Sequence, residues 1–591
     1  TLDADAVAAS GAQSVADLLA ARTDLFVKQY GSAGLATASM RGMGGSQTLV
    51  LVDGQRVADP QTGQTDLSLL PSLLIESAEI IHGNQAARYG SGALGGVVRL
   101  QTHRPSTALR AEAKAGTGAF GWKTAGGIVS GAGDQWSGLL AAEGTRSAGD
   151  FPYTNKSLVP ARTQRRGNAQ RRMGTAFGRL ARREDSSRTS VTIWGTKAKR
   201  GLPGTANASS SNATQWDRQG RLSLSHRHTA EWGQLHLTGR GQRSTLRFRN
   251  PDANSRRSQA DTSRTWRTTL EAQVTSTLQP SLLVTTGVTA GYDQATLRSG
   301  VQRWRLGAYA DATWSLGSIT LHPALRIDVD QPAGVGRSVT ALSPQLGVVW
   351  QPGPDWIRLR GQVGRAFRAP NFNERFYEPG GNPNLRAEKG WNAETGVEMR
   401  LGSERHFLRS EVTAFVTRLT NKIVWQPSFV GPGLQVWRPQ NRDRVLSRGI
   451  EWTATGRWRV SSETRFSGRL TFAHVAATDQ GTPQARAYGK QLPYTPRERL
   501  KSQLGLRWRW FRLNLSTQLV GSRYVTTDES QSLSPYQVVD TQLQAQYNIG
   551  PATLTAQLGL QNLLDTDYSV VRLYPMPPRH IRARLKLSFT P

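Results

Sequence analysis

The chain has 591 residues, a mean hydropathy of −0.47, no cysteine and a formal net charge of +32. It contains no run of about 18 or more apolar residues, which excludes a membrane-spanning helix. The lack of cysteine excludes a disulfide framework. Low mean hydropathy does not exclude a membrane β-barrel, because its lumen-facing positions are polar and alternate with lipid-facing ones.

The positive charge is unevenly distributed along the chain. Up to Thr107, nine acidic and seven basic residues give −2, so the remainder carries +34. Nucleic-acid binders concentrate Arg and Lys on one patch or helix face, whereas here they alternate with apolar residues along many segments. We therefore expect no nucleic-acid partner. Four explanations of the positive charge are left open: cations that line a lumen, contact with phosphorylated lipid, attraction of anionic solutes, and pairing with acidic residues.

The first part of the chain is typical of a small α+β domain. Ser14 is expected to cap a short helix, with Asp17 three positions further on. The segment TLVLVDGQRV predicts two short strands joined at Asp53-Gly54, a strong hairpin signal. IESAEIIHG predicts another strand, and the glycine-rich GSGALGGVVRLQT leads into a further one. We place the end of this domain at Thr107.

Residues 108–591 show period-two alternation that recurs to the end of the chain. The last segment is the clearest case, because its apolar residues alternate with polar ones: Ile581, Ala583, Leu585, Leu587 and Phe589 against Arg582, Arg584, Lys586 and Ser588. On a strand, one such face meets lipid and the other meets water. An open sheet of this size would expose long edges, and closure removes them. The pattern predicts an all-β transmembrane barrel.

Polar stretches rich in Gly, Pro, Asn and Ser interrupt this alternation and are expected to form long loops. They are Arg146–Arg172, Gly201–Gln215, Arg247–Arg264, Tyr377–Arg386, Asn421–Asp443 and Thr478–Arg497.

Several motifs resemble one family in their sequence and order. They include SMRGMGGSQTLVLVDGQRV and ARYGSGALGGVVRLQT near the start, RAFRAPNFNERF and GNPNL in the middle, and LQNLLDTDY and YPMPPRHIRARLKLSF near the end. Together they are similar to the TonB-dependent outer-membrane receptors. Chain length and the stretches DLSLLP and VLVDGQRV resemble the cobalamin (vitamin B12) receptors within that family.

This resemblance implies a barrel of about 22 antiparallel strands over residues 108–591, with residues 1–107 as a plug inside its lumen. It implies a monomeric transport receptor in the bacterial outer membrane, not an enzyme, with outer-membrane lipid or lipopolysaccharide around it. A surface lipoprotein is a further partner to consider. The resemblance also implies contact with TonB, which we expect through a segment upstream of this chain, because no TonB-box-like stretch precedes the plug. His82-Gly83-Asn84 departs from the usual Arg-Gly-Pro of the family.

The resemblance further suggests a polar latch between plug and barrel. On the plug side it would use Arg41, Glu76, Glu79 and Arg88, and on the barrel side Arg365, Arg368 and Glu374. The alternative is static ion pairing without a role in release. Buried ion pairs add little net stability, so a wet, polar interface would let the plug shift without exposing a dry core.

The substrate is the open question. Cobalamin or a related corrinoid is the leading expectation, and a ferric siderophore is the alternative, favoured by the basic barrel. Candidate substrate-binding residues lie on plug apices and long loops: Gln61, Thr62, Phe151, Tyr153, Phe376, Tyr377 and Trp437. For the aromatic residues, a place in the membrane-interface belt is the competing explanation.

No catalytic, metal or cofactor site is expected from the sequence. The nine His residues have no Glu or Cys at metal-ligand spacing, and no G-x-S-x-G elbow occurs. The stretch NFNERFYEPGG between FRAP and NPNL lacks the histidine that haem receptors of the family carry there, which argues against haem. A passive porin is an alternative to a gated receptor, and it would require the first domain to sit outside the lumen. The early loops hold only the scattered carboxylates Asp150, Asp252 and Asp261, so no calcium site is expected.

Overall fold

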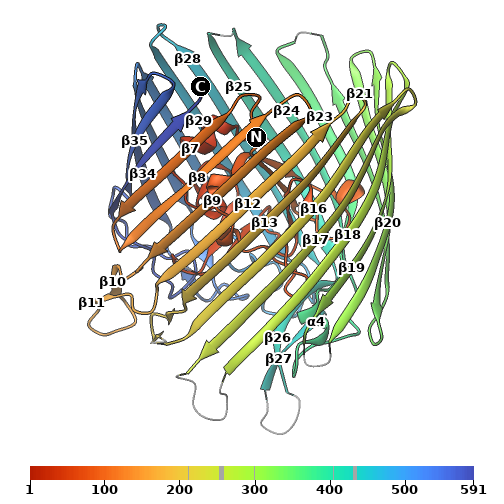
Figure 1. Cartoon of the computed structure of the whole chain (residues 1–591). Helices are drawn as coiled ribbons and strands as arrows, with labels where there is room; N and C mark the ends of the chain where they lie inside the picture. Colours follow the sequence, from red (N-terminus) through yellow and green to blue (C-terminus); the bar gives the residue numbers. More distant parts are fainter. Residues whose placement is uncertain are drawn as a thin grey trace.

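The computed structural model describes residues 1–32, 34–209, 212–251, 259–297, 300–353, 355–403, 405–429, 435–442 and 444–591. Its dominant feature is a closed ring of 22 strands, each antiparallel to its neighbours, which confirms the predicted fold class (Figure 1). No helix in the described ranges is long and apolar enough to cross a bilayer. In chain order the barrel strands are β7 (Arg110–Gly118), β8 (Trp122–Ala132), β9 (Trp136–Ser147), β12 (Arg171–Arg183), β13 (Ser187–Gly201), β16 (Thr214–Ala230), β17 (Gly233–Asn250), β18 (Gln259–Gln279), β19 (Leu282–Ala295), β20 (Val301–Leu316), β21 (Ile319–Ala333), β22 (Val339–Trp350), β23 (Ile357–Arg368), β24 (Glu388–Gly402), β25 (His406–Thr420), β28 (Val445–Arg459), β29 (Thr464–Asp479), β30 (Glu498–Trp508), β31 (Phe511–Val520), β34 (Tyr536–Ile549), β35 (Ala552–Gln561) and β36 (His580–Phe589).

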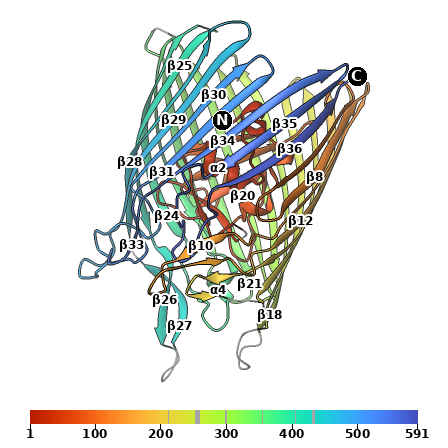
Figure 2. The same ribbon diagram turned by 90° about the vertical axis from the view of Figure 1, so that its left-hand side faces the viewer.

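The N-terminal elements form a plug inside this ring, as the red ribbons show (Figure 2). Its four-stranded sheet has the order β4-β3-β6-β5, with β3 parallel to β6. The plug elements are α1 (Ala4–Ala8), α2 (Val15–Arg22), β1 (Phe26–Gln29), β2 (Ala36–Ser39), β3 (Thr48–Val52), β4 (Gln55–Arg56), the 3-10 turns η1 (Leu67–Leu69) and η2 (Ser72–Leu74), β5 (Ile75–His82), α3 (Ala86–Tyr89) and β6 (Gly96–Thr102).

Local sequence signals in the plug act as predicted. Ser14 caps α2 with a full capping box, because its hydroxyl accepts from the Asp17 amide while the Asp17 carboxylate accepts from the Ser14 amide. Asp53 (φ +48) and Gly54 (φ +79) make the predicted turn between β3 and β4, which needs left-handed φ at both positions.

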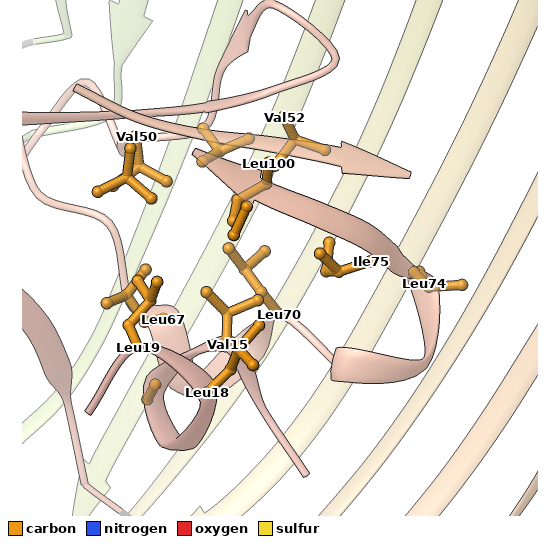
Figure 3. Packing of buried hydrophobic residues seen from close by; sticks show 14 of the residues in the cluster. Val15, Leu18, Leu19, Val50, Val52, Leu67, Leu70, Leu74, Ile75 and Leu100 are labelled. Carbon is orange, nitrogen blue, oxygen red and sulfur yellow. The ribbon is translucent and has the colours of Figure 1, made fainter. Parts of the chain in front are cut away.

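A dry core joins α2 to one face of the plug sheet (Figure 3). Leu18 and Leu19 of α2 are fully buried, and Val50, Val52 and Leu100 of the sheet meet them across the cluster. Burying side chains of this size stabilises the plug by roughly 1.5–3 kcal/mol each before entropy is counted. The plug therefore has its own packed interior inside the barrel.

The barrel wall alternates as predicted. In β36, Ile581, Leu585 and Leu587 are exposed on the outside, while Arg582 and Arg584 between them lie in the lumen, where their guanidinium groups stand over the ring of the buried Trp122. The outside is apolar and the inside is polar, which is the arrangement that a bilayer requires.

The two ends of the barrel differ. At the upper end in Figure 1, consecutive strands join through short turns, such as Gly133–Gln135 between β8 and β9. At the lower end several connections are long and carry structure of their own. They contain β10 (Pro152–Asn155) with β11 (Arg162–Arg165), β14 (Gly204–Thr205) with β15 (Ala208–Ser209), β26 (Lys422–Phe429) with β27 (Gln435–Arg442), β32 (Arg523–Tyr524) with β33 (Ser532–Leu533), and helix α4 (Phe372–Phe376).

Of the six predicted long loops, some contain hairpins and one is largely taken up by barrel strands. Hairpins form inside three of the six predicted loops, because pairing satisfies backbone groups that would otherwise lack partners. The stretch 247–264 is mostly strand, since β17 continues to Asn250 and β18 starts at Gln259. Residues 210–211, 252–258, 430–434 and 443 of these predicted loops, including Asp252, lie outside the described residues.

Candidate functional site: the plug–barrel interface and its outer apices

Arg41 is the most heavily bonded plug residue at the barrel wall. It lies in the turn between Met40 and Met43 with φ +51, only 2% exposed. Its Nη2 lies 2.7 Å from Glu451 Oε2 on β28, and its Nη1 2.5 Å from Glu394 Oε2 on β24. Its guanidinium also stacks 4.2 Å from the Phe415 ring centroid. Burial disfavours the charged form, but the two carboxylates outweigh it and raise the pKa of Arg41, so the guanidinium stays charged.

A second charged pair lies beside Arg41. His82 at the end of β5 and Asp24 before β1 are 2.6 Å apart, Nε2 to Oδ2. Burial lowers the pKa of His82, but Asp24 and Glu451 outweigh that effect and raise it. Burial alone would raise the pKa of Asp24, and His82, Arg499 and Lys501 hold it below its usual range.

Asp24, His82 and Glu451 together offer three potential ligand atoms within 4.8 Å of one another. Sequence reasoning missed this cluster, because its members come from distant segments. Arg41 already occupies both oxygens of Glu451. A protonated His82 therefore balances the remaining charge of Asp24, and a metal ion is not required for that balance.

Lys501 on β30 anchors the end of helix α2. Its Nζ donates to the carbonyls of Ala20, Thr23 and Leu25 at 2.6, 2.7 and 2.8 Å. The last carbonyls of a helix lack intrahelical partners, and a cation there complements the helix dipole. Lys501 was not predicted either, since nothing in its strand distinguishes it from other lumen-facing cations.

Arg368 and Glu374, expected to hold the plug, bond mainly to each other. The two nitrogens Nη1 and Nη2 of Arg368 each lie 2.9 Å from a Glu374 oxygen, and Nε lies 2.6 Å from Glu388 Oε2. All three residues belong to the barrel domain. They reach the plug through Gln47, whose Nε2 donates to Glu388 Oε2 at 2.8 Å.

Arg365 does not face the plug. It is opposite Trp391 in the β23–β24 register, and that tryptophan is exposed on the outer wall. Period two puts Arg368 inside and Arg365 outside, because the two positions differ by an odd number of residues.

The other three predicted plug charges have no ion pair to the barrel among the described residues. Glu79 pairs with Arg99 inside the plug at 2.8 Å, with both side chains about 40% exposed. Glu76 lines a polar cavity at the short-turn end beside His103. Arg88 lines a cavity between plug and wall and lies over the ring of Tyr89. Of the plug charges named from sequence, Arg41 alone among the described residues pairs directly with the wall.

The plug apex that carries Gln61 and Thr62 is tied to the barrel at the long-loop end. The carbonyl of Gln61 accepts from the Asn373 amide at 2.9 Å, and that of Thr62 accepts from Asn371 Nδ2 at 3.0 Å. The Thr265 hydroxyl donates to Asp59 Oδ2 at 2.9 Å. Helix α4 and strand β18 thus hold the apex from two sides.

The predicted aromatic contacts fall into two groups. Phe151 and Tyr153 are buried, and Phe151 packs edge-on against Phe120. Phe376 packs in an apolar cluster beside Phe372. By contrast, Tyr377 and Trp437 are 46% and 63% exposed at the long-loop end, where Tyr377 also stacks edge-on with Trp425.

Comparison with protein families gives two matches. The family model described as TonB dependent receptor-like, beta-barrel, matches residues 136–563, and the TonB-dependent Receptor Plug Domain matches residues 1–97. Among curated proteins, the vitamin B12 transporter BtuB of Vibrio vulnificus is 26% identical over 452 residues, which is 72% of this chain and 66% of that protein. The alignment thus spans just under two thirds of that relative's length. The vitamin B12 transporter BtuB of Photobacterium profundum is 22% identical over 588 residues, 98% of this chain and 90% of that protein.

Solved structures share the same fold at lower identity. The siderophore receptor PirA from Acinetobacter baumannii superposes with a TM-score of 0.80 at 18% identity, covering 98% of this chain and 96% of that one. The ferric enterobactin receptor PfeA from Pseudomonas aeruginosa, solved with enterobactin, gives 0.81 at 18% identity and 99% of both chains. With a barrel model matching most of the sequence and a plug model matching the domain inside the lumen, the chain belongs to the TonB-dependent receptors of the outer membrane.

Proposed function

We propose that this receptor takes up a scarce, large solute by TonB-driven displacement of its plug, and that the solute is cobalamin or a related corrinoid. Two curated relatives named as vitamin B12 transporters support the substrate, one of them aligned over 98% of this chain. The siderophore receptors match at 18% identity, where likeness carries the fold but not the ligand.

The observation that carries the gating proposal is the polar character of the plug–barrel contact. Arg41, Lys501, Asn371 and Thr265 bond across it. Apolar contacts with the wall are limited to patches, such as Leu139, Phe177 and Trp194 against the plug core. Water can replace polar partners one by one as the plug moves, while separating a dry apolar interface would cost about 25 cal/mol for each Å² exposed. A pull would therefore exchange the polar contacts for water at little cost, and the apolar patches that the plug shares with the wall would set the main resistance to its movement.

TonB would act from the short-turn end, which faces the periplasm in this proposal. The first residues of the chain lie there: Leu2 bonds with Ala78 of β5, the strand that ends at His82. A pull on this segment would reach β5 and then the Asp24–His82–Arg41 group. The substrate would bind at the opposite end, where helix α4 and the apex of Gln61 and Thr62 meet.

A ferric siderophore is the second candidate, and a specific observation favours it. The chain after Thr107 carries +34, and a positive lumen raises the local concentration of anionic solutes. Cobalamin has little net charge and would gain less from this field.

Binding to purified receptor separates the two candidates. Cyanocobalamin and a panel of ferric siderophores, including ferric enterobactin, would be titrated by isothermal calorimetry in detergent. We expect submicromolar affinity for cyanocobalamin that changes little between 50 and 300 mM salt. Affinity for cyanocobalamin in the micromolar range or weaker would end the corrinoid proposal, and tight, salt-dependent binding of a ferric chelate would support the alternative.

A further inference from the structure

The outer wall of the barrel carries a row of cations at the extracellular end of adjacent strands. Cross-strand register places Lys123 of β8 opposite Arg146 of β9, Arg146 opposite Arg172 of β12, and Arg172 opposite Lys199 of β13. The row continues through Trp216 of β16 to Arg247 of β17. These strands lie side by side on the front of the barrel in Figure 1.

The row faces outward. The sequence neighbours Arg171 and Arg200 point into the lumen, where Arg171 donates to the plug carbonyl of Ser68 and Arg200 pairs with Asp66 at 2.8 Å. Because side chains alternate along a strand, Arg172 and Lys199 lie on the outer face, and both are exposed.

No counter-ion for four cations of the row lies in the part of the chain that the structure describes. No ion pair or side-chain hydrogen bond there involves Lys123, Arg146, Arg172 or Lys199. Directly opposed residues in an antiparallel pair have Cα atoms roughly 4.5–5.5 Å apart, and like charges there repel. An external anion placed on four such cations would relieve this repulsion. Trp216 lies between Lys199 and Arg247, with their charged groups 5.2 and 5.6 Å from its ring, which places an interfacial aromatic at the same level.

A shallow apolar groove runs along the membrane side of the row. Its floor is made of small residues on the same outer face, including Gly127, Gly144, Gly174 and Gly195, and Lys197 and Arg218 stand at one side. A Cβ placed on Gly174 or Gly195 would meet nothing within 4 Å, so the floor is open. Further from the row, towards the middle of the membrane, exposed aliphatic side chains such as Leu140 and Ile193 cover the outer wall.

We propose that this row and groove bind a phosphorylated lipid of the outer leaflet, with its phosphates on the Arg146–Arg172–Lys199 row and an acyl chain along the glycine floor. The chemistry matches on both counts. Arg and Lys in an exposed row are suited to phosphate oxygens, and an apolar trough next to them is suited to a hydrocarbon chain rather than to a soluble anion. The site accounts for part of the barrel's basic excess, and it does not depend on which solute the receptor transports.

The test is native mass spectrometry of the purified full chain titrated with diphosphorylated lipid A in detergent. Dephosphorylated lipid A and inorganic phosphate are the comparison ligands. The double variant Arg146→Gln/Arg172→Gln removes two cations from the row. A matched control, Arg418→Gln/Arg448→Gln, removes two exposed outward cations on β25 and β28, where the register places them opposite Leu446 and Val416 instead of other cations.

We expect the row variant to weaken binding of diphosphorylated lipid A by roughly 10- to 30-fold, since each cation near an anionic lipid surface contributes about a factor of five. The control should change it by less than about twofold. Gly174→Leu, which fills the groove and keeps every charge, should also weaken binding. Equal binding of the phosphate-free lipid, equal losses in the control, or full competition by inorganic phosphate would overturn the proposal.

Discussion

The guanidinium of Arg41 lies against the carboxylate of Glu451, with Nη2 and Nε 2.7 and 3.1 Å from the same oxygen. The two residues are 410 positions apart in the chain. Arg41 adopts a left-handed φ of +51 and is followed by Gly42 at +80, so a tight turn projects its side chain into the wall. The Ser447 hydroxyl donates to the Arg41 carbonyl at 2.6 Å and fixes the turn itself.

Replacing Arg41 with Met should destabilise plug docking by about 3–5 kcal/mol, because Glu394 and Glu451 would remain buried without their cation. Hydrogen exchange of residues 36–57, followed by mass spectrometry, measures this opening free energy. Adding Glu394→Gln and Glu451→Gln should recover most of the lost docking free energy, because the uncharged cluster no longer contains a buried charge without a partner. A triple variant as unstable as the single one would contradict this explanation.

Plug docking should weaken as pH rises through the folded-state pKa of His82. That pKa is raised above the ordinary value of about 6.5, so protonated His82 contributes stability fully below about pH 6.5 and loses it at higher pH. Asp24 has a lowered pKa, and its contribution is lost only in strong acid, outside this range. Hydrogen-exchange protection of β5, corrected for intrinsic rates, should decrease in the native protein as pH rises from 6 to 9. In the His82→Gln variant it should not change over this range. A native profile as flat as that of the variant would refute the assignment.

Lys501→Met should loosen the end of helix α2. Three charge-assisted hydrogen bonds disappear and three carbonyls lose their donor, which we expect to cost about 2–4 kcal/mol. Faster exchange over residues 15–25 is the measurement. Lys156→Met is the matched control, since that side chain is 71% exposed in a loop and should have no effect there. Unchanged exchange in Lys501→Met would show that the carbonyls find water instead.

Trp437→Ala and Tyr377→Ala should each weaken substrate binding by roughly 5- to 30-fold, while leaving thermal stability nearly unchanged, because both rings are exposed at the extracellular end. Phe151→Ala removes a ring that is 1% exposed, so its first effect should be on loop stability. Calorimetric titration with whichever solute binds the native receptor, paired with melting curves, separates the two effects. If Trp437→Ala bound the solute normally, its ring would belong to the interface belt.

The alternation of β36, the Ser14 capping box and the Asp53-Gly54 hairpin could all be predicted from the sequence, because each depends on residues a few positions apart. The family motifs predicted the enclosing barrel and the plug. The boundary at residue 107 lies between β6, which ends at Thr102, and β7, which begins at Arg110. It stays a prediction.

Tertiary structure alone decided which charges meet. Arg41 was predicted as a plug contact, but its partners Glu394 and Glu451 were not, and Arg365 was placed on the wrong face. Period two along a strand tells which residues share a face. The register between strands and the depth of the plug in the barrel decide which wall residue lies opposite a given plug residue. The ion pairs, the Lys501 anchor and the outward row from Lys123 to Lys199 all depend on that register, which is set by the closed ring as a whole and by no local stretch of sequence.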